Sequence, residues 1–118
     1  MEKFFVTTPT SGDYLTTVRL TTGGLCALAE FDVDSTEDFK VCVTESLLIL
    51  KRSGYQKADI TFTIGEALGC RIEGVGEPLQ AEESVEDEIS YALLNALLGK
   101  VEFGKKDGGR VASIVFEG

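Results

Sequence analysis

The stretch that decides the fold runs from residue 34 to residue 64 and is DSTEDFKVCVTESLLILKRSGYQKADITFTI. Its first five residues offer hydroxyl and carboxylate caps and early negative charge, both typical of a helix start. Apolar and small residues then recur at helical spacing, at Phe39, Cys42, Val43, Ser46, Leu47 and Leu50. Lys51, Arg52 and Gly54 suit a helix end, and residues 58–64 alternate between polar and apolar as a half-buried strand does. The stretch therefore predicts a long helix to about Arg52, followed directly by a strand.

The rest of the sequence adds elements on both sides of this stretch. Residues 2–8 are typical of an opening strand, and residues 14–30 are compatible with a helix in which Gly23 and Gly24 predict a kink or close packing. Further along we expect a strand at 68–72 and, after it, a helix with Ile89, Leu93, Ala96 and Leu97 on its apolar face. Tyr91, Leu94 and Leu98 widen that face. Two strands at 100–104 and 110–116 follow, joined by a tight turn at 106–109. This order predicts a single α/β domain over 1–118, an α+β two-layer sandwich with a mostly antiparallel sheet and helices on one face.

The composition is that of a folded domain with a strongly acidic surface. Of 118 residues, 43% are hydrophobic and 26% are charged, a mixture typical of globular proteins. Twenty acidic residues against eleven basic ones give a net charge of −9. Because nucleic acids and anionic membranes both need a basic binding surface, this charge argues against either as the main partner. It favours protein partners with a basic surface, whose approach it would accelerate.

Histidine is absent, and the three cysteines, Cys26, Cys42 and Cys70, lie far apart in the chain. Without histidine, no Ser-His-Asp or Cys-His catalytic arrangement and no histidine-ligated zinc can form. An odd number of distant cysteines indicates reduced thiols that serve as small buried hydrophobic residues, and no metal site is predicted. The sequence shows no signal peptide and no apolar run that approaches the length of a membrane helix. We therefore expect a cytoplasmic protein.

Two segments resemble the nucleotide-binding boxes of a known family. They are VTESLLILKRSGY at 43–55, on the long helix, and IEGVG at 72–76. In spacing, element order and local sequence they resemble the bacterial anti-sigma-factor (serine-protein kinase) branch of the histidine-kinase-type (GHKL) ATPases. That family has an E-x-x-x-N box on its long second helix and a D-x-G-x-G box after the following strand pair. The ending at 101–114 also matches the family's strand, glycine turn and strand, so the resemblance spans nearly the whole chain and implies the histidine-kinase-type ATPase fold.

Carried over residue by residue, the resemblance implies a degraded ATP site. Glu45 matches the family's glutamate, a general base beside the γ-phosphate, and Gly74 and Gly76 match the two glycines of the second box. The chain has Ile49 at the position of the magnesium-binding asparagine and Ile72 at that of the adenine-binding aspartate. Isoleucine offers no oxygen to magnesium, and the segment after Gly76 is short for the family's glycine-rich lid. We expect Mg-ATP to bind weakly or not at all, with Glu45 catalytic only if activity is retained.

Considered without the resemblance, the same positions have simpler interpretations. Glu45 is compatible with a solvated acid on a helix, and the Gly74–Gly76 pair next to Pro78 is compatible with an ordinary turn. The acidic residues of 82–88 suit the start of a helix, or a surface that meets a basic protein face.

The resemblance implies a regulatory protein-binding domain, similar to an anti-sigma factor and acting in partner switching. It implies a sigma factor or an anti-anti-sigma protein as partner and pairing as a homodimer, with the exposed flank of the first helix as the apolar contact. Two alternatives stay open, because a fold does not settle a function. One is an active ATP-dependent serine-protein kinase that uses Glu45, and the other is an inert structural or oligomerisation module of the same fold.

Overall fold

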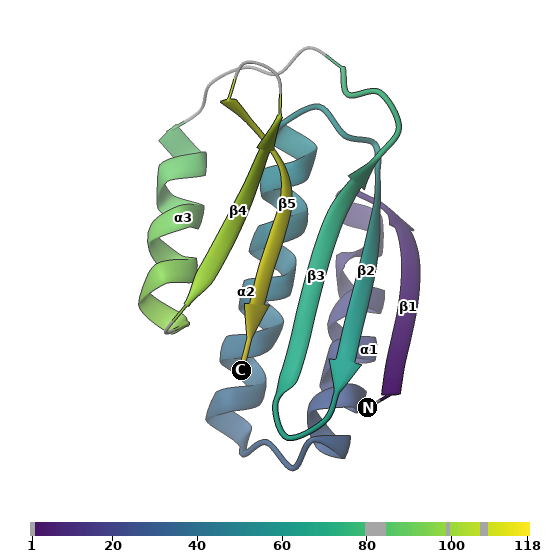
Figure 1. The fold of residues 1–118 in the computed structure, drawn as a ribbon, viewed down its shortest axis with the longest axis vertical. Coiled ribbons are helices and arrows are strands. Elements are labelled where there is room, and N and C mark those ends of the chain that lie inside the picture. The colour runs from purple at the N-terminus through teal and green to yellow at the C-terminus, as the bar shows by residue number, and fades with distance from the viewer. Residues whose placement is uncertain (1, 80–84, 99, 107–108) are drawn as a thin grey trace.

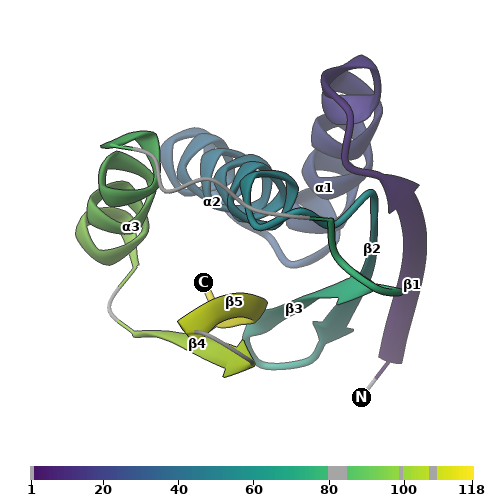
Figure 2. The same ribbon diagram turned by 90° about the horizontal axis from the view of Figure 1, so that it is seen from above.

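The computed structural model describes residues 2–79, 85–98, 100–106 and 109–118. Within them, a five-stranded sheet forms one layer and three α-helices lie against one of its faces (Figure 1, Figure 2). The strands are β1 (Glu2–Pro9), β2 (Lys57–Ile64), β3 (Leu68–Val75), β4 (Val101–Lys106) and β5 (Arg110–Glu117). The helices are the short 3-10 helix η1 (Gly12–Tyr14), α1 (Leu15–Leu28), α2 (Val33–Arg52) and α3 (Val85–Leu97). None of the described helices is long and apolar enough to cross a membrane.

The sheet has the spatial order β1-β2-β3-β5-β4, and every neighbouring pair is antiparallel. In β2, Ile60 pairs with Val6 of β1 on one side and with Ile72 of β3 on the other. Side chains of the same kind therefore form rows across the sheet, and the apolar rows face the helices. The predicted α+β sandwich with an antiparallel sheet is confirmed.

Helix α2 lies in the middle of the helical layer, with α1 and α3 beside it and the sheet beneath it (Figure 2). It ends at Arg52 as predicted, but its N-cap is Asp32, ahead of the residues that the sequence favoured. The Asp32 carboxylate accepts a hydrogen bond of 2.7 Å from the Ser35 amide, and this bonding lowers the Asp32 pKa. Because neighbours cover α2 on three sides, eight of its residues are buried: Phe39, Cys42, Val43, Thr44, Ser46, Leu47, Ile49 and Leu50.

The first predicted helix, 14–30, is in fact η1 followed by the continuous helix α1. Gly23 lies inside α1, where a Cβ atom would come within 2.9 Å of Lys40 Cε on α2. Gly24 has open space around it instead. Gly23 thus allows close packing of α1 on α2, whereas Gly24 does not take part in it.

The register of α3 differs from the prediction. Leu94 and Leu98, predicted at the edge of the apolar face, are buried, and so is Ser90. Ile89 and Leu93, predicted at its centre, are 57% and 37% exposed. Ala96, on the same predicted face, is exposed as well. Both sides of this helix are apolar, so helical periodicity alone cannot tell which side turns inwards.

The closing hairpin follows the prediction with small changes in length. Strand β4 extends to Lys106, because a register shift between Gly104 and Lys105 lets it continue along β5. The predicted turn at 106–109 includes residues 107 and 108, which lie outside the described residues.

Candidate functional site

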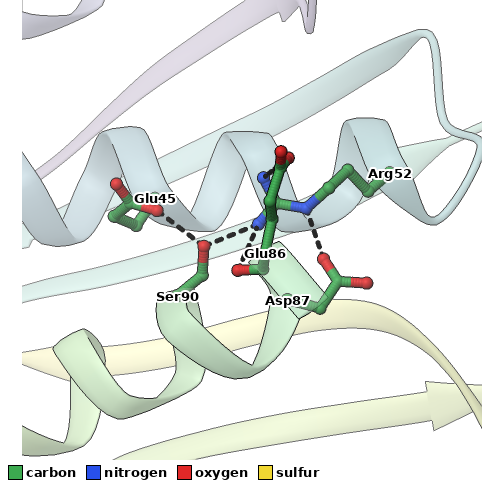
Figure 3. A network of polar contacts seen from close by, with 5 residues as sticks. All are labelled: Glu45, Arg52, Glu86, Asp87 and Ser90. Atoms are coloured by element: carbon green, nitrogen blue, oxygen red, sulfur yellow. Dashed lines mark hydrogen bonds and ion pairs between the residues drawn. The ribbon is translucent and has the colours of Figure 1, made fainter. Parts of the chain in front are cut away.

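Glu45 lies on the side of α2 that faces α3 (Figure 3). The Ser90 hydroxyl, from α3, donates a hydrogen bond of 2.6 Å to Oε2 of Glu45. Ser90 is almost completely buried, and its hydroxyl oxygen accepts a hydrogen bond of 2.6 Å from Nη2 of Arg52. The carboxylate proposed as a general base is therefore engaged between two helices.

Arg52, the last residue of α2, extends this contact to the first turn of α3 (Figure 3). Its Nε donates to the Asp87 carboxylate, and its Nη1 lies 3.9 Å from the Glu86 carboxylate. Only 17% of the Arg52 side chain and 21% of the Asp87 side chain are exposed, so this charge pair is screened less than a surface pair. The Glu86 side chain is 75% exposed. We call Glu45, Arg52, Glu86, Asp87 and Ser90 the α2–α3 junction.

Gly74 lies near the end of β3, where the ring of Tyr55 packs directly on it. A Cβ atom at position 74 would overlap the ring carbons of Tyr55. Tyr55 is 4% exposed, and its carbonyl oxygen accepts a hydrogen bond of 2.7 Å from the Thr10 hydroxyl. The missing side chain at Gly74 therefore makes room for an aromatic ring of the core.

Gly76 follows β3 with a φ of 82°, in the left-handed region that glycine adopts at little cost. It lines a cavity of about 430 Å³ together with Tyr55, Glu77, Pro78, Lys106 and Arg110. Glu45 is not among the described residues that line this cavity. Gly74 and Gly76 thus both lie next to Tyr55, Gly74 under its ring and Gly76 at the cavity that Tyr55 helps to line.

The two isoleucines that replace the family's polar ligands belong to the core. Ile49 and Ile72 both have 0% of their surface exposed, one on α2 and the other on β3 beneath it. Tyr55 packs on Gly74, and Ser90 is hydrogen-bonded to Glu45. Of the five residues that match positions of the family's boxes, all except Gly76 therefore make contacts inside the protein. These residues do not fit a Mg-ATP site, and no catalytic step is derived through one.

The roles of three residues in this region were not predicted from the sequence. They are Tyr55, which packs on Gly74, and Arg52 and Ser90, which belong to the α2–α3 junction. Tyr55 carried a weak signal, since an apolar residue that follows a helix-ending glycine such as Gly54 commonly packs back on the last turn of the helix. Ser90 carried one too, because it lies four residues before Leu94 and thus shares its helix face. The partners of Ser90 lie 38 and 45 positions earlier, and no local pattern identifies contacts at that separation.

The three cysteines are buried and free, as predicted. Burial raises the pKa of Cys26 and Cys70, and burial with the nearby carboxylates of Asp38 and Glu45 raises that of Cys42 to about 12. At neutral pH all three are thiols, which are poor nucleophiles. Within the part of the chain that the structure describes, no three cysteine, aspartate or glutamate side chains gather in a way that could hold a metal ion.

Apolar side chains lie on the outside of two helices. On α1, Leu20 and Leu28 are 71% and 70% exposed, with Gly24 between them on the same face. Val33, at the start of α2, is 77% exposed. We call Leu20, Gly24, Leu28 and Val33 the α1 surface; it contains the flank of the first helix that the sequence suggested as an apolar contact.

Comparison of the sequence with protein-family models gives no match, and comparison with curated proteins gives none either.

Proposed function

We propose that the protein is a regulatory protein-binding domain with the histidine-kinase-type (GHKL) ATPase fold, in a form that uses its nucleotide-site positions for internal packing. The element order, the antiparallel sheet and the helices on one face support this fold. The packing of Tyr55 on Gly74 is the observation that carries the functional part. A nucleotide could approach that glycine only if a buried ring left the core.

The proposed activity is partner switching in the cytoplasm, similar to that of an anti-sigma factor. A sigma factor and an anti-anti-sigma protein are the proposed partners, and a homodimer is the proposed assembly. The α1 surface supports this role, because it exposes large aliphatic side chains that a partner would remove from water. The net charge of −9 supports a partner with a basic surface.

The proposal is tested by comparing the wild-type protein with Leu20→Ser/Leu28→Ser. Light scattering measures the mass in solution, and the immobilised protein captures partners from an extract of its native cell. We expect the substitution to weaken homodimerisation and capture by about tenfold or more, as loss of central apolar anchors does. Capture should be the same with and without Mg-ATP.

Leu79→Ser is the matched control, because Leu79 is 57% exposed and lies outside the α1 surface. Phosphate transfer from ATP to a captured protein, lost in Glu45→Gln, would contradict the proposal and establish the active kinase. A monomer that captures nothing would leave the inert module as the better description.

A further inference from the structure

Helix α3 carries an outward apolar face that the proposed function does not use. Ile89, Ala92, Leu93 and Ala96 are all exposed, and their spacing places them along one side of the helix. Ile89 is 57% exposed and Leu93 is 37% exposed, so two large aliphatic side chains face solvent one helical turn apart. We call these four residues the α3 surface.

The opposite side of α3 is held firmly, so the α3 surface cannot turn inwards. Leu94 is completely buried, and Ser90 is bonded within the α2–α3 junction. Tyr91 contacts Phe103 of β4 edge to face, with ring centroids 5.0 Å apart. Rotating the helix to bury Ile89 would break all three of these attachments.

The charges around the α3 surface are acidic. The first turn of α3 carries Glu86, Asp87 and Glu88, and its last turn has no basic residue. Arg52 pairs with Glu86 and Asp87, whereas the exposed Glu88 carries its negative charge beside the apolar stripe, one helical turn before Ala92. A second copy of α3 would present the same acidic first turn and no basic residue in its last turn, so it offers no charges complementary to this surface.

We propose that the α3 surface is a docking site for a basic amphipathic helix of a partner protein. Aliphatic side chains of that helix would lie against Ile89 and Leu93, and the small side chains of Ala92 and Ala96 permit close approach. Lysine or arginine at the border of the partner's apolar face would meet the acidic first turn, where Glu88 is exposed. This inference rests on the proposed function, because it gives the same protein-binding domain a second binding surface, separate from the α1 surface.

The probe is a fluorescein-labelled peptide of leucine and lysine, 18 residues long, that forms a helix with one apolar and one basic face; anisotropy measures its binding. Ile89→Ser/Leu93→Ser should weaken binding by about tenfold or more, since these are the apolar anchors. Glu88→Gln should weaken it by about two- to threefold at about 0.1 M salt and hardly at all at about 1 M, where charges are screened within about 3 Å. Leu20→Ser/Leu28→Ser, on the α1 surface, should leave binding unchanged.

Three outcomes would overturn this inference. Equal weakening by the α1 and α3 variants would show non-specific adsorption, and equal binding of a leucine–glutamate peptide would remove the electrostatic argument. A homodimer that Ile89→Ser/Leu93→Ser converts to a monomer would make a second copy the occupant. Failure of the proposed function gives different results. The protein would then transfer phosphate from Mg-ATP, or capture no partner through the α1 surface, and neither result changes the binding of the peptide to the α3 surface.

Discussion

The inner region around α2 and the outer faces of α1 and α3 use their residues in opposite ways. Around α2, positions that the resemblance assigns to a nucleotide are occupied by buried isoleucines, by a glycine under an aromatic ring and by a carboxylate bonded to serine. On the outer faces, leucine and isoleucine side chains that would suit a core face solvent. Residue type alone therefore does not locate function in this protein, because similar side chains form the core in one region and face solvent in the other.

The largest expected effect comes from the position of the family's asparagine. Ile49→Asn should lower the free energy of unfolding by about 3–5 kcal/mol, because it removes buried hydrocarbon and places an amide in the core. Urea unfolding followed by circular dichroism measures it. If this variant does not fold, Ile49→Val should still cost about 0.5–1.5 kcal/mol.

Leu93→Asn is the matched control on the outer face of α3, where the amide stays in water. It should change stability by no more than about 0.5 kcal/mol. Equal effects of the two substitutions would erase the contrast between the inner and outer regions.

A smaller effect is expected when a methyl group is added to a glycine in each region. Gly74→Ala should cost about 1–3 kcal/mol, since the new Cβ overlaps the Tyr55 ring. Gly24→Ala should instead stabilise the protein by about 0.5–1 kcal/mol, because Gly24 lies on a helix with open space around it. Thermal or urea unfolding gives both values. A neutral Gly74→Ala would mean that the space beside β3 is free for a ligand.

The buried thiols predict how stability depends on alkaline pH. Their pKa values are raised by folding, so above the ordinary value of 9.0 the unfolded chain loses protons that the folded chain keeps. Stability should be unaffected by these groups below pH 9 and fall above it, by about 1.4 kcal/mol per pH unit for each thiol. For Cys42 this decline should continue to a pH of about 12.

Urea unfolding at several pH values, for wild type and Cys42→Ala, isolates the contribution of this thiol. The slope above pH 9 should be shallower in Cys42→Ala. Identical slopes, or a thiol reagent that at pH 8 labels one more cysteine in folded wild type than in folded Cys42→Ala, would show that Cys42 is accessible.

The smallest effect is expected at Glu45. Glu45→Gln should cost less than about 1 kcal/mol, since an amide oxygen can still accept the hydrogen bond of Ser90. Ser90→Ala, measured alongside, removes the shared hydroxyl and should cost more. A larger loss in Glu45→Gln than in Ser90→Ala would show that the charge itself holds the α2–α3 junction.

Local sequence patterns were sufficient to predict the order of the elements and the antiparallel sheet, because alternation in 58–64 and the spacing along α2 are unambiguous. The cap of α2 was misplaced because Asp32 precedes a run of residues that could all serve as caps. The inner face of α3 was predicted wrongly at Ile89 and Leu93, since Ile89 and Leu94 are equally apolar and a contact with distant α2 residues decides between them. For the same reason, Glu45 could be placed on its helix from the sequence, but its bond to Ser90 and the link to Arg52 could not be predicted.

Calorimetric titration of the wild-type protein with Mg-ATP tests whether the positions of the nucleotide boxes serve internal packing. If they do, we expect no saturable heat and a dissociation constant weaker than about 1 mM, which corresponds to less than about 4 kcal/mol of binding free energy. A dissociation constant near 1 μM, about 8 kcal/mol, would contradict this expectation, because binding of that strength requires the contacts that Ile49, Ile72 and Tyr55 exclude.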